Sequence, residues 1–282
     1  MSGPLGTFFY LIAWGIYLLA LEAVLQRGQR SLLFREPGTY LRLALFSIPV
    51  WLAYEALNVR LLNWEYWSLP ASAAVRWPGY ALAYATVLPA ILETAEFLRP
   101  RLPDNLSITP RLGLSDKRWT TEYTILGMLC LALPLLWPRW FFPLIWAPAF
   151  LLCEPWLARR VPRRSWLKAL AAGRPHDFYA LLLSGLVCGL LWESLNFWAG
   201  AKWKYTVPWP RGPKLFEMPL LGYLGFPPFA LSCASLWRSF DELWRSAGAP
   251  RRTAAVLAFA AFSLAAFQAI DSYTVRSFVS LW

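Results

Sequence analysis

Residues 41–63 read LRLALFSIPVWLAYEALNVRLLN, an apolar segment that carries Glu55 and Asn58 in its second half. Roughly 20 apolar residues are enough for a helix to cross a bilayer. A carboxylate inside such a helix costs a few kcal/mol, so it usually faces the interior of a bundle or a wet cavity. Asn58 follows Glu55 by three residues, which places both side chains on one helical face. The segment therefore predicts a membrane helix with a polar inner face.

Seven further segments share this apolar character, and the whole chain is 58% hydrophobic and only 15% charged. Soluble domains carry about 25% charged residues. We expect an all-α, polytopic membrane bundle of about eight transmembrane helices at residues 5–25, 41–63, 79–98, 122–137, 139–157, 178–198, 217–237 and 253–272. The fourth and fifth segments are short and nearly touch at Trp137 and Pro138. Residues 122–157 are therefore either a tight hairpin of two spans or one broken element.

Basic residues are distributed unevenly among the predicted loops. Of the 27 Lys and Arg residues, 19 follow the first, third, fifth and seventh spans. Because cytoplasmic loops are enriched in Lys and Arg, this bias places both termini on the non-cytoplasmic side. The net charge of +11 is explained by these loops, which meet anionic lipid headgroups or an acidic protein partner; we expect no nucleic-acid binding.

Cofactor and metal motifs are missing from the sequence. The four cysteines lie in apolar spans without a CxxC pair, which is typical of packing residues. His176 is the single histidine, so a haem held by two histidines is excluded. The chain has no GxGxxG or GxxxxGK[ST] nucleotide-binding loop. We therefore predict neither a cofactor nor a metal site.

The two halves of the chain resemble each other. Tyr54-Glu55-Ala-Leu-Asn58, followed by Trp64-Glu-Tyr66, returns as Trp192-Glu193-Ser-Leu-Asn196, followed by Trp203-Lys-Tyr205. The matched order also includes Gly79-Tyr80 with Pro89 against Gly222-Tyr223 with Pro228, and Trp14 with Glu22 against Trp146 with Glu154. We predict two four-helix membrane repeats, residues 1–137 and 138–282. An even number of spans per repeat gives parallel repeats related by a pseudo-twofold axis along the membrane normal.

The recurring polar residues are the candidate functional groups. We assign Glu55 and Glu193 as catalytic carboxylates, each supported by the carboxamide of Asn58 or Asn196. The alternative is a structural cluster in which each glutamate bonds its asparagine or another helix. Trp64, Tyr66, Trp203 and Tyr205 either roof a shared cavity and stack on an apolar ligand, or form the aromatic belt of the membrane interface.

Glu93 is the third predicted catalytic carboxylate. It follows Pro89, and a proline inside a helix frees a backbone carbonyl and opens the helix. Its counterpart in the second half is Ser232, so the two copies need not do the same work. Glu22 and Glu154 lie near helix ends beside arginines, and we expect them to form interfacial ion pairs.

The order of these residues resembles the lycopene cyclase domain of the small membrane type found in carotenoid pathways. The resemblance covers about 45 residues per copy: Glu55–Asn58, Trp64–Tyr66 and Pro89–Glu93, then Glu193–Asn196, Trp203–Tyr205 and Pro228–Ser232. That family has Pro-x-Glu-Glu and three-helix units, whereas this chain has Pro89-Ala-Ile-Leu-Glu93 and four-helix units. The resemblance implies that a carboxylic acid protonates a polyene and that carboxylates and aromatic faces stabilise the cation.

Three functions remain open at this point. The first is binding of a long apolar isoprenoid or carotenoid-like lipid between the repeats, with cyclase- or isomerase-like acid–base chemistry. The second is a non-catalytic subunit of a membrane complex, docked through the basic cytoplasmic loops. The third is a proton-coupled transporter, which repeats, proline-broken spans and intramembrane acids also fit.

Overall fold

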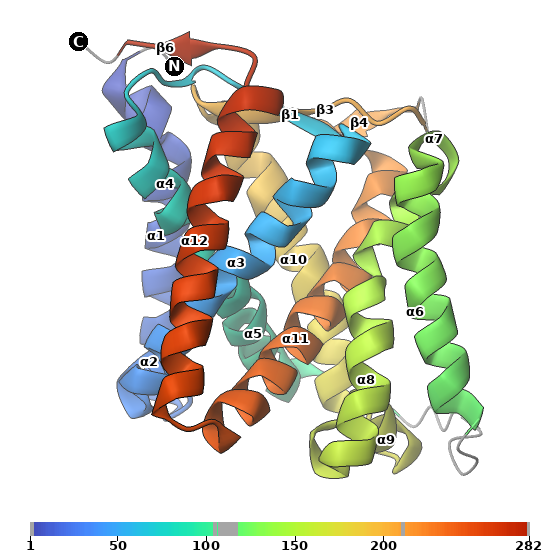
Figure 1. The fold of residues 1–282 in the computed structure, drawn as a ribbon. Helices are drawn as coiled ribbons and strands as arrows, with labels where there is room; N and C mark the ends of the chain where they lie inside the picture. The colour runs from blue at the N-terminus through green and yellow to red at the C-terminus, as the bar shows by residue number, and fades with distance from the viewer. Residues whose placement is uncertain (1–2, 104–105, 107–117, 210–211, 281–282) are drawn as a thin grey trace. The chain divides into compact units, whose positions relative to one another are not determined.

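A computed structural model describes residues 3–103, 106, 118–209 and 212–280. Helices dominate the described chain, as predicted, and short strands connect some of them (Figure 1). The elements are α1 Pro4–Arg27, α2 Leu32–Arg35, α3 Pro37–Leu61, β1 Trp64–Trp67, β2 Leu69–Pro70, α4 Ala73–Ala85, α5 Val87–Leu98, η1 Arg99–Arg101, α6 Arg118–Leu136, α7 Pro138–Phe141, η2 Phe142–Trp146, α8 Pro148–Arg160, η3 Pro162–Arg164, α9 Trp166–Ala171, α10 His176–Trp198, β3 Lys202–Tyr205, β4 Lys214–Leu215, β5 Met218–Pro219, η4 Leu220–Gly225, α11 Phe226–Ser246, α12 Ala249–Tyr273 and β6 Phe278–Val279.

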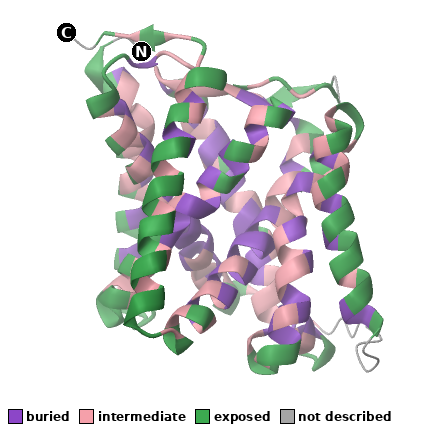
Figure 2. Ribbon diagram, in the orientation of Figure 1, coloured by how far each residue is buried: buried purple, intermediate pink, exposed green. Residues whose placement is uncertain are grey.

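Seven helical segments of the described chain are long and apolar enough to cross a membrane. An eighth crossing is present if Pro138–Trp146 and Pro148–Arg160, which meet at a bend of 42°, count as one span. In the most apolar stretch of α12 only 17% of the residues are buried, and in those of α1 and α6 only 28%. Figure 2 shows the exposed residues along α12 and α6. Soluble monomers rarely expose such apolar surface, so the chain is a multi-pass helical membrane protein.

The ambiguous region 122–157 consists of a straight helix and a bent pair. Helix α6 ends at Leu136, and Pro138 starts the next helical turn. Two more prolines, Pro143 and Pro148, lie at the starts of η2 and α8. Proline lacks the N–H that an internal helical position needs, so three prolines in eleven residues explain why this segment bends. Ser232 bridges the bend, since its hydroxyl donates to the carbonyl of Trp146 at 2.7 Å and accepts the N–H of Phe150 at 3.2 Å.

The described chain separates into two compact units. The first unit comprises residues 1–90, 188–223 and 249–282, and the second comprises residues 91–187 and 224–248. Helices α5 and α10 pass from one unit into the other. Each unit contains segments from both predicted repeats, 1–137 and 138–282, and the four-helix repeat stays a prediction.

In the first unit, α12 packs along α3, and α3 also packs against α4 (Figure 1). A break at Thr86 separates α4 from α5, one turn before Pro89, as the proline predicted. Ser47 of α3 bridges this break: its hydroxyl donates to the carbonyl of Tyr84 at 2.5 Å and accepts the N–H of Leu88 at 3.0 Å. In the second unit, α8 packs between α6 and α11.

Glu22 and Glu154 are both buried, and Glu154 has no exposed surface. Glu22 accepts the hydroxyl of Ser31 at 2.5 Å, and Glu154 accepts the hydroxyl of Ser165 at 2.8 Å. Each serine also caps the short helix that follows, α2 or α9. The interfacial ion pair predicted for Glu154 is wrong. Its carboxylate accepts hydrogen bonds from two hydroxyls and a backbone N–H, those of Ser165, Ser235 and Leu167.

Candidate functional site

The first candidate site surrounds Glu55 on α3, a residue with 1% exposed surface. Its Oε1 accepts the indole N–H of Trp51 at 2.8 Å, the indole N–H of Trp64 at 3.1 Å and the hydroxyl of Tyr66 at 2.5 Å. Trp64 also reaches Oε2 at 3.3 Å. Trp64 and Tyr66 are two residues apart on β1, and alternate residues of a strand point to the same face. Strand β1 therefore presents both donors to one carboxylate.

Asn58 holds the turn that brings β1 back to α3. Its Oδ1 accepts the backbone N–H groups of Asn63 at 2.8 Å and Trp64 at 3.3 Å, and its Nδ2 donates to the carbonyl of Trp64 at 2.8 Å. Leu62 takes the left-handed conformation at the helix end, with φ of 51°. The prediction that the Asn58 carboxamide supports Glu55 directly is wrong. Asn58 instead bonds the backbone of the strand whose side chains hold Glu55.

The second site, around Glu193 on α10, repeats this pattern. Glu193 is fully buried. Its Oε1 accepts the indole N–H of Trp203 at 3.3 Å and the hydroxyl of Tyr205 at 2.7 Å. Asn196 accepts the N–H of Trp203 and donates to the carbonyl of Trp203, both at 2.9 Å. The local structure of the first motif is thus reproduced, including the use of asparagine for the backbone and not for the carboxylate.

Strands β1 and β3 join the two sites within the first unit. They pair antiparallel, with Trp64 opposite Tyr205, Glu65 opposite Lys204 and Tyr66 opposite Trp203. Each tryptophan therefore faces the tyrosine of the other copy, and the register is symmetric about the central pair. The Glu–Asn and Trp-x-Tyr motifs that the sequence predicted to act together do meet in one place.

The two carboxylates differ in their donors. Glu55 has a third donor in Trp51, four residues earlier on α3. The residue four positions before Glu193 is Gly189, which has no side chain to replace that indole. Among the described residues, none donates to Oε2 of Glu193, and this oxygen is buried. The second site therefore holds a carboxyl group with one oxygen fixed and the other without a donor.

Aromatic rings surround both carboxyl groups. Near Glu55, the ring of Trp51 lies 6.1 Å from that of Trp64 and 6.0 Å from that of Tyr84. Around the second motif, α1 supplies the rings. Tyr10 meets Trp203 edge-on at 5.2 Å, and Trp14 lies 5.5 Å from Trp192. Trp51 and Tyr10 were not among the predicted site residues, although Trp51 lies one helical turn before Glu55 and was recognisable by that spacing.

Tyr66 and Tyr205 lie on the strands, outside the membrane-spanning helices. Burial raises the pKa of both phenols well above the ordinary tyrosine value, and the adjacent glutamates, Glu55 and Glu193, raise it further. Both tyrosines therefore stay protonated at physiological pH. They act as hydrogen-bond donors to the carboxyl groups and not as bases.

Glu93 lies on the part of α5 that belongs to the second unit, with 3% of its surface exposed. Its predicted catalytic role with Glu55 and Glu193, which belong to the first unit, stays a prediction. Its counterpart Ser232 has the structural role described above, which is to bridge the bend between η2 and α8. Within the described residues no three His, Cys, Asp or Glu side chains group as metal ligands.

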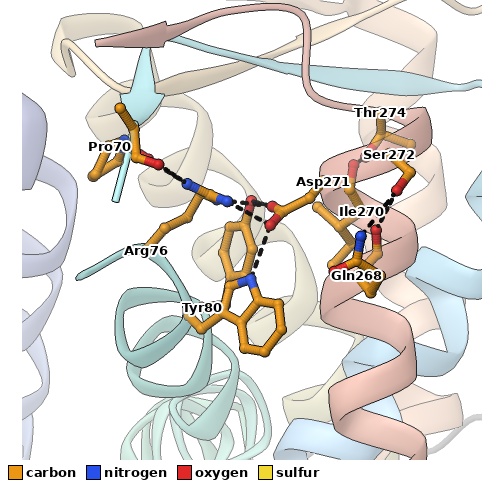
Figure 3. A network of polar contacts seen from close by, with 10 residues as sticks. Pro70, Arg76, Tyr80, Gln268, Ile270, Asp271, Ser272 and Thr274 are labelled. Atoms are coloured by element: carbon orange, nitrogen blue, oxygen red, sulfur yellow. Dashed lines mark hydrogen bonds and ion pairs between the residues drawn. The ribbon is translucent and has the colours of Figure 1, made fainter. Parts of the chain in front are cut away.

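A second polar cluster of the first unit was not predicted (Figure 3). Arg76 of α4 forms a two-pronged ion pair with Asp271 of α12, at 2.8 Å and 2.5 Å. Asp271 also accepts the indole N–H of Trp77 at 2.8 Å and the hydroxyl of Tyr80 at 3.0 Å. Arg76 in turn donates to the carbonyl of Pro70 at 2.6 Å. The cluster connects the end of α12 to α4 and β2. Arg76 and Asp271 lie 195 residues apart in the sequence.

Comparison with protein-family models, curated proteins and solved structures found no match for this chain.

The Arg76–Asp271 pair should be a main contributor to the stability of the first unit. Its side chains are only 7% and 10% exposed. Removing one partner of a buried pair costs about 3–5 kcal/mol because the other charge is left without compensation. We expect Asp271→Asn to lower the free energy of unfolding by this amount, as measured by denaturant titration in detergent micelles.

The matched control is Glu65→Gln. Glu65 pairs with Arg276 at 2.6 Å, but Arg276 is 46% exposed. Exposed pairs contribute about 0–1 kcal/mol. Equal losses of stability in the two variants would contradict the structural role given to the buried pair.

Proposed function

We propose that this membrane protein binds a long apolar isoprenoid or carotenoid-like lipid, and that Glu193 transfers a proton to it. The observation that carries the proposal is the buried carboxyl group of Glu193. One oxygen accepts hydrogen bonds from Trp203 and Tyr205, and the other has no donor among the described residues. A carboxylic acid oriented in this way has a free oxygen from which a proton can leave. General acids of this kind speed reactions by about 10²–10⁴-fold.

The proposed step needs no redox partner. The Glu193 proton adds to one carbon of a terminal double bond, and a C–H bond forms while the π bond breaks. A neighbouring double bond then attacks the resulting cation and closes a ring, or the chain stays acyclic. Loss of a proton from an adjacent carbon to the Glu193 carboxylate restores a double bond and regenerates the acid. Substrate and product then have the same formula, as in a cyclase or an isomerase.

The aromatic residues near Glu193 fit the cationic intermediate. The faces of Trp and Tyr rings carry negative potential and attract cations. Tyr10, Trp14, Trp192 and Trp203 are linked by ring contacts between 5.2 Å and 6.5 Å. They are also apolar, so one set of side chains suits both a hydrocarbon ligand and its transient positive charge.

Glu55 and Glu93 have different places in this proposal. Glu55 is held by three donors, Trp51, Trp64 and Tyr66, which supports a positioning role through the shared strand pair. The sequence-based assignment of Glu55 and Glu93 as catalytic carboxylates remains open, and their glutamine variants test it alongside Glu193.

Incubation of the purified protein with acyclic polyenes of different length in D₂O tests the proposal. We expect each ring closed, or each double bond shifted, to introduce one deuterium into the product, because the proton of Glu193 exchanges with solvent. Mass spectrometry measures this label. Glu193→Gln should lower the rate by about 10²-fold or more.

The matched control is Glu122→Gln, which alters an exposed carboxylate on α6. It should leave the rate unchanged. Absence of bound or converted lipid across the panel would contradict the proposal, and so would conversion by Glu193→Gln at the wild-type rate.

We also infer that the chain crosses the membrane eight times with both termini on the non-cytoplasmic side. Strands β1 and β3 mark one end of the first unit. The start of α1 and the residue after the end of α12 both bond to the chain at that end. The carbonyl of Gly6 accepts the N–H of Gly200 at 2.8 Å, and the carbonyl of Thr274 accepts the N–H of Tyr66 at 2.9 Å. An even number of crossings returns a chain to its starting side, which supports counting residues 138–160 as a span. The bias of Lys and Arg toward alternate loops supports the orientation.

Reporter fusions test this topology. Alkaline phosphatase fused to either terminus should be active, because it folds only outside the cytoplasm, and a green fluorescent protein fused at either end should stay dark when exported through the general secretory route. Opposite results at the two termini would indicate seven crossings. Inactive phosphatase and fluorescent green fluorescent protein at both termini would be consistent with eight crossings but would contradict the orientation.

A further inference from the structure

A cavity of about 280 Å³ in the second unit is lined by charged and by apolar residues. Helices α5, α10 and α11 each turn one face toward it, at the spacing of successive helical turns. The charged residues that line it are Arg99, Arg164, Arg238, Glu96 and Asp177. Drug-sized ligands fill pockets of about 300–1,000 Å³, so this cavity has room for a headgroup and the first part of an attached chain.

Two of the three arginines are already paired with carboxylates. Arg99 contacts Asp177 at 2.6 Å, in a pair that is about half exposed. Arg164 contacts Asp241 at 2.8 Å and Glu242 at 3.1 Å. These pairs hold the two guanidinium groups in place, and they reduce the positive charge that the cavity presents to a ligand.

Arg238 is different. No carboxylate among the described residues lies within ion-pair distance of its guanidinium group. The side chain donates to the carbonyl of Arg164 at 2.7 Å, and its guanidinium carbon lies 3.1 Å from the ring centre of Trp166. A guanidinium group has five N–H donors in a planar fork. One hydrogen bond and one aromatic face therefore fix its orientation and leave donors for a further acceptor.

The apolar lining of the cavity includes Leu92, Leu181, Trp237 and three alanines. A free inorganic anion gains no binding energy from apolar residues. A lipid, in contrast, can place its headgroup on the arginines and its chain along the apolar residues. Arginine binds phosphate oxygens with two parallel hydrogen bonds, which lysine cannot match. The adjacent loops carry the basic residues predicted to face the cytoplasm, where the leaflet is rich in anionic lipid.

We propose that this cavity binds a phosphate group through Arg238, and that the phosphate belongs to an anionic membrane lipid whose chain lies against Leu92, Leu181 and Trp237. The cavity belongs to the second unit, whereas Glu55 and Glu193 belong to the first, and the proposal does not depend on the polyene chemistry. Inorganic phosphate offers Arg238 the same oxygens but has no acyl chain. Comparing it with the lipid therefore shows by experiment which of the two the cavity binds.

Titration of the full-length protein in a neutral detergent, followed by native mass spectrometry, tests the proposal. The probes are dioleoyl phosphatidylglycerol, dioleoyl phosphatidylcholine and inorganic phosphate. We expect one tightly bound phosphatidylglycerol, and Arg238→Gln should weaken its binding at least tenfold. The zwitterionic lipid should bind more weakly than phosphatidylglycerol, because its ammonium group offsets the phosphate charge.

The matched control is Arg251→Gln, an exposed arginine at the start of α12, which should bind phosphatidylglycerol like the wild type. Millimolar inorganic phosphate could instead displace the lipid and bind directly, with this binding lost in Arg238→Gln. That result would support a phosphate site at Arg238 but overturn the lipid as the source of the phosphate. Unchanged lipid binding by Arg238→Gln would overturn the proposal.

A second variant covers the case in which Arg238→Gln does not fold. Ala95→Leu narrows the cavity from α5 and keeps every arginine. It should also weaken phosphatidylglycerol binding about tenfold. Wild-type affinity in Ala95→Leu would overturn the assignment of the lipid to this cavity.

Discussion

A carboxyl group buried in a membrane helix must have hydrogen-bond donors, and the fold of the first unit is arranged to provide them. Leaving a buried polar group without a partner costs several kcal/mol. Here the donors come from a short strand that turns back along the end of the helix. The period of two along the strand aligns an indole N–H and a phenol O–H with one glutamate. Asn58 and Asn196 fix the turn, so each Glu-x-x-Asn motif depends on the Trp-x-Tyr motif that follows it.

The pairing of β1 with β3 makes the two sites a single structural unit. In this register, the residues that donate to Glu55 lie directly opposite those that donate to Glu193. The difference in hydrogen bonding between the two sites then comes from single residues. Trp51 supplies a third donor to Glu55, whereas Gly189 offers no side chain in that place, and no described residue donates to Oε2 of Glu193. In the function proposed above, Glu193 is therefore the group that transfers the proton.

The sequence predicted the features that depend on local pattern. Apolar length predicted the helices, and Pro89 predicted the break near Thr86, because a proline disrupts the preceding turn. The recurrence of Glu, Asn, Trp and Tyr predicted that these residues would meet. Their bonding was predicted incorrectly, since spacing on a helix suggested that Asn58 faces Glu55 but could not reveal the competing backbone groups of the next turn. The Arg76–Asp271 pair was missed because no periodicity links residues so far apart in the chain.

The most direct test of this account is a cross-link between the two motif copies. Cysteines replacing Glu65 and Lys204, which are opposite each other in the strand pair, should form a disulfide on mild oxidation. Directly opposed residues have Cα atoms about 4.5–5.5 Å apart, within the 4.4–6.8 Å that a disulfide spans. Cysteines at 65 and 202 are out of register by two residues and should cross-link far less. Mapping by mass spectrometry is expected to find the 65–204 disulfide in the folded protein. Its absence, or equal cross-linking of the out-of-register pair, would contradict the account.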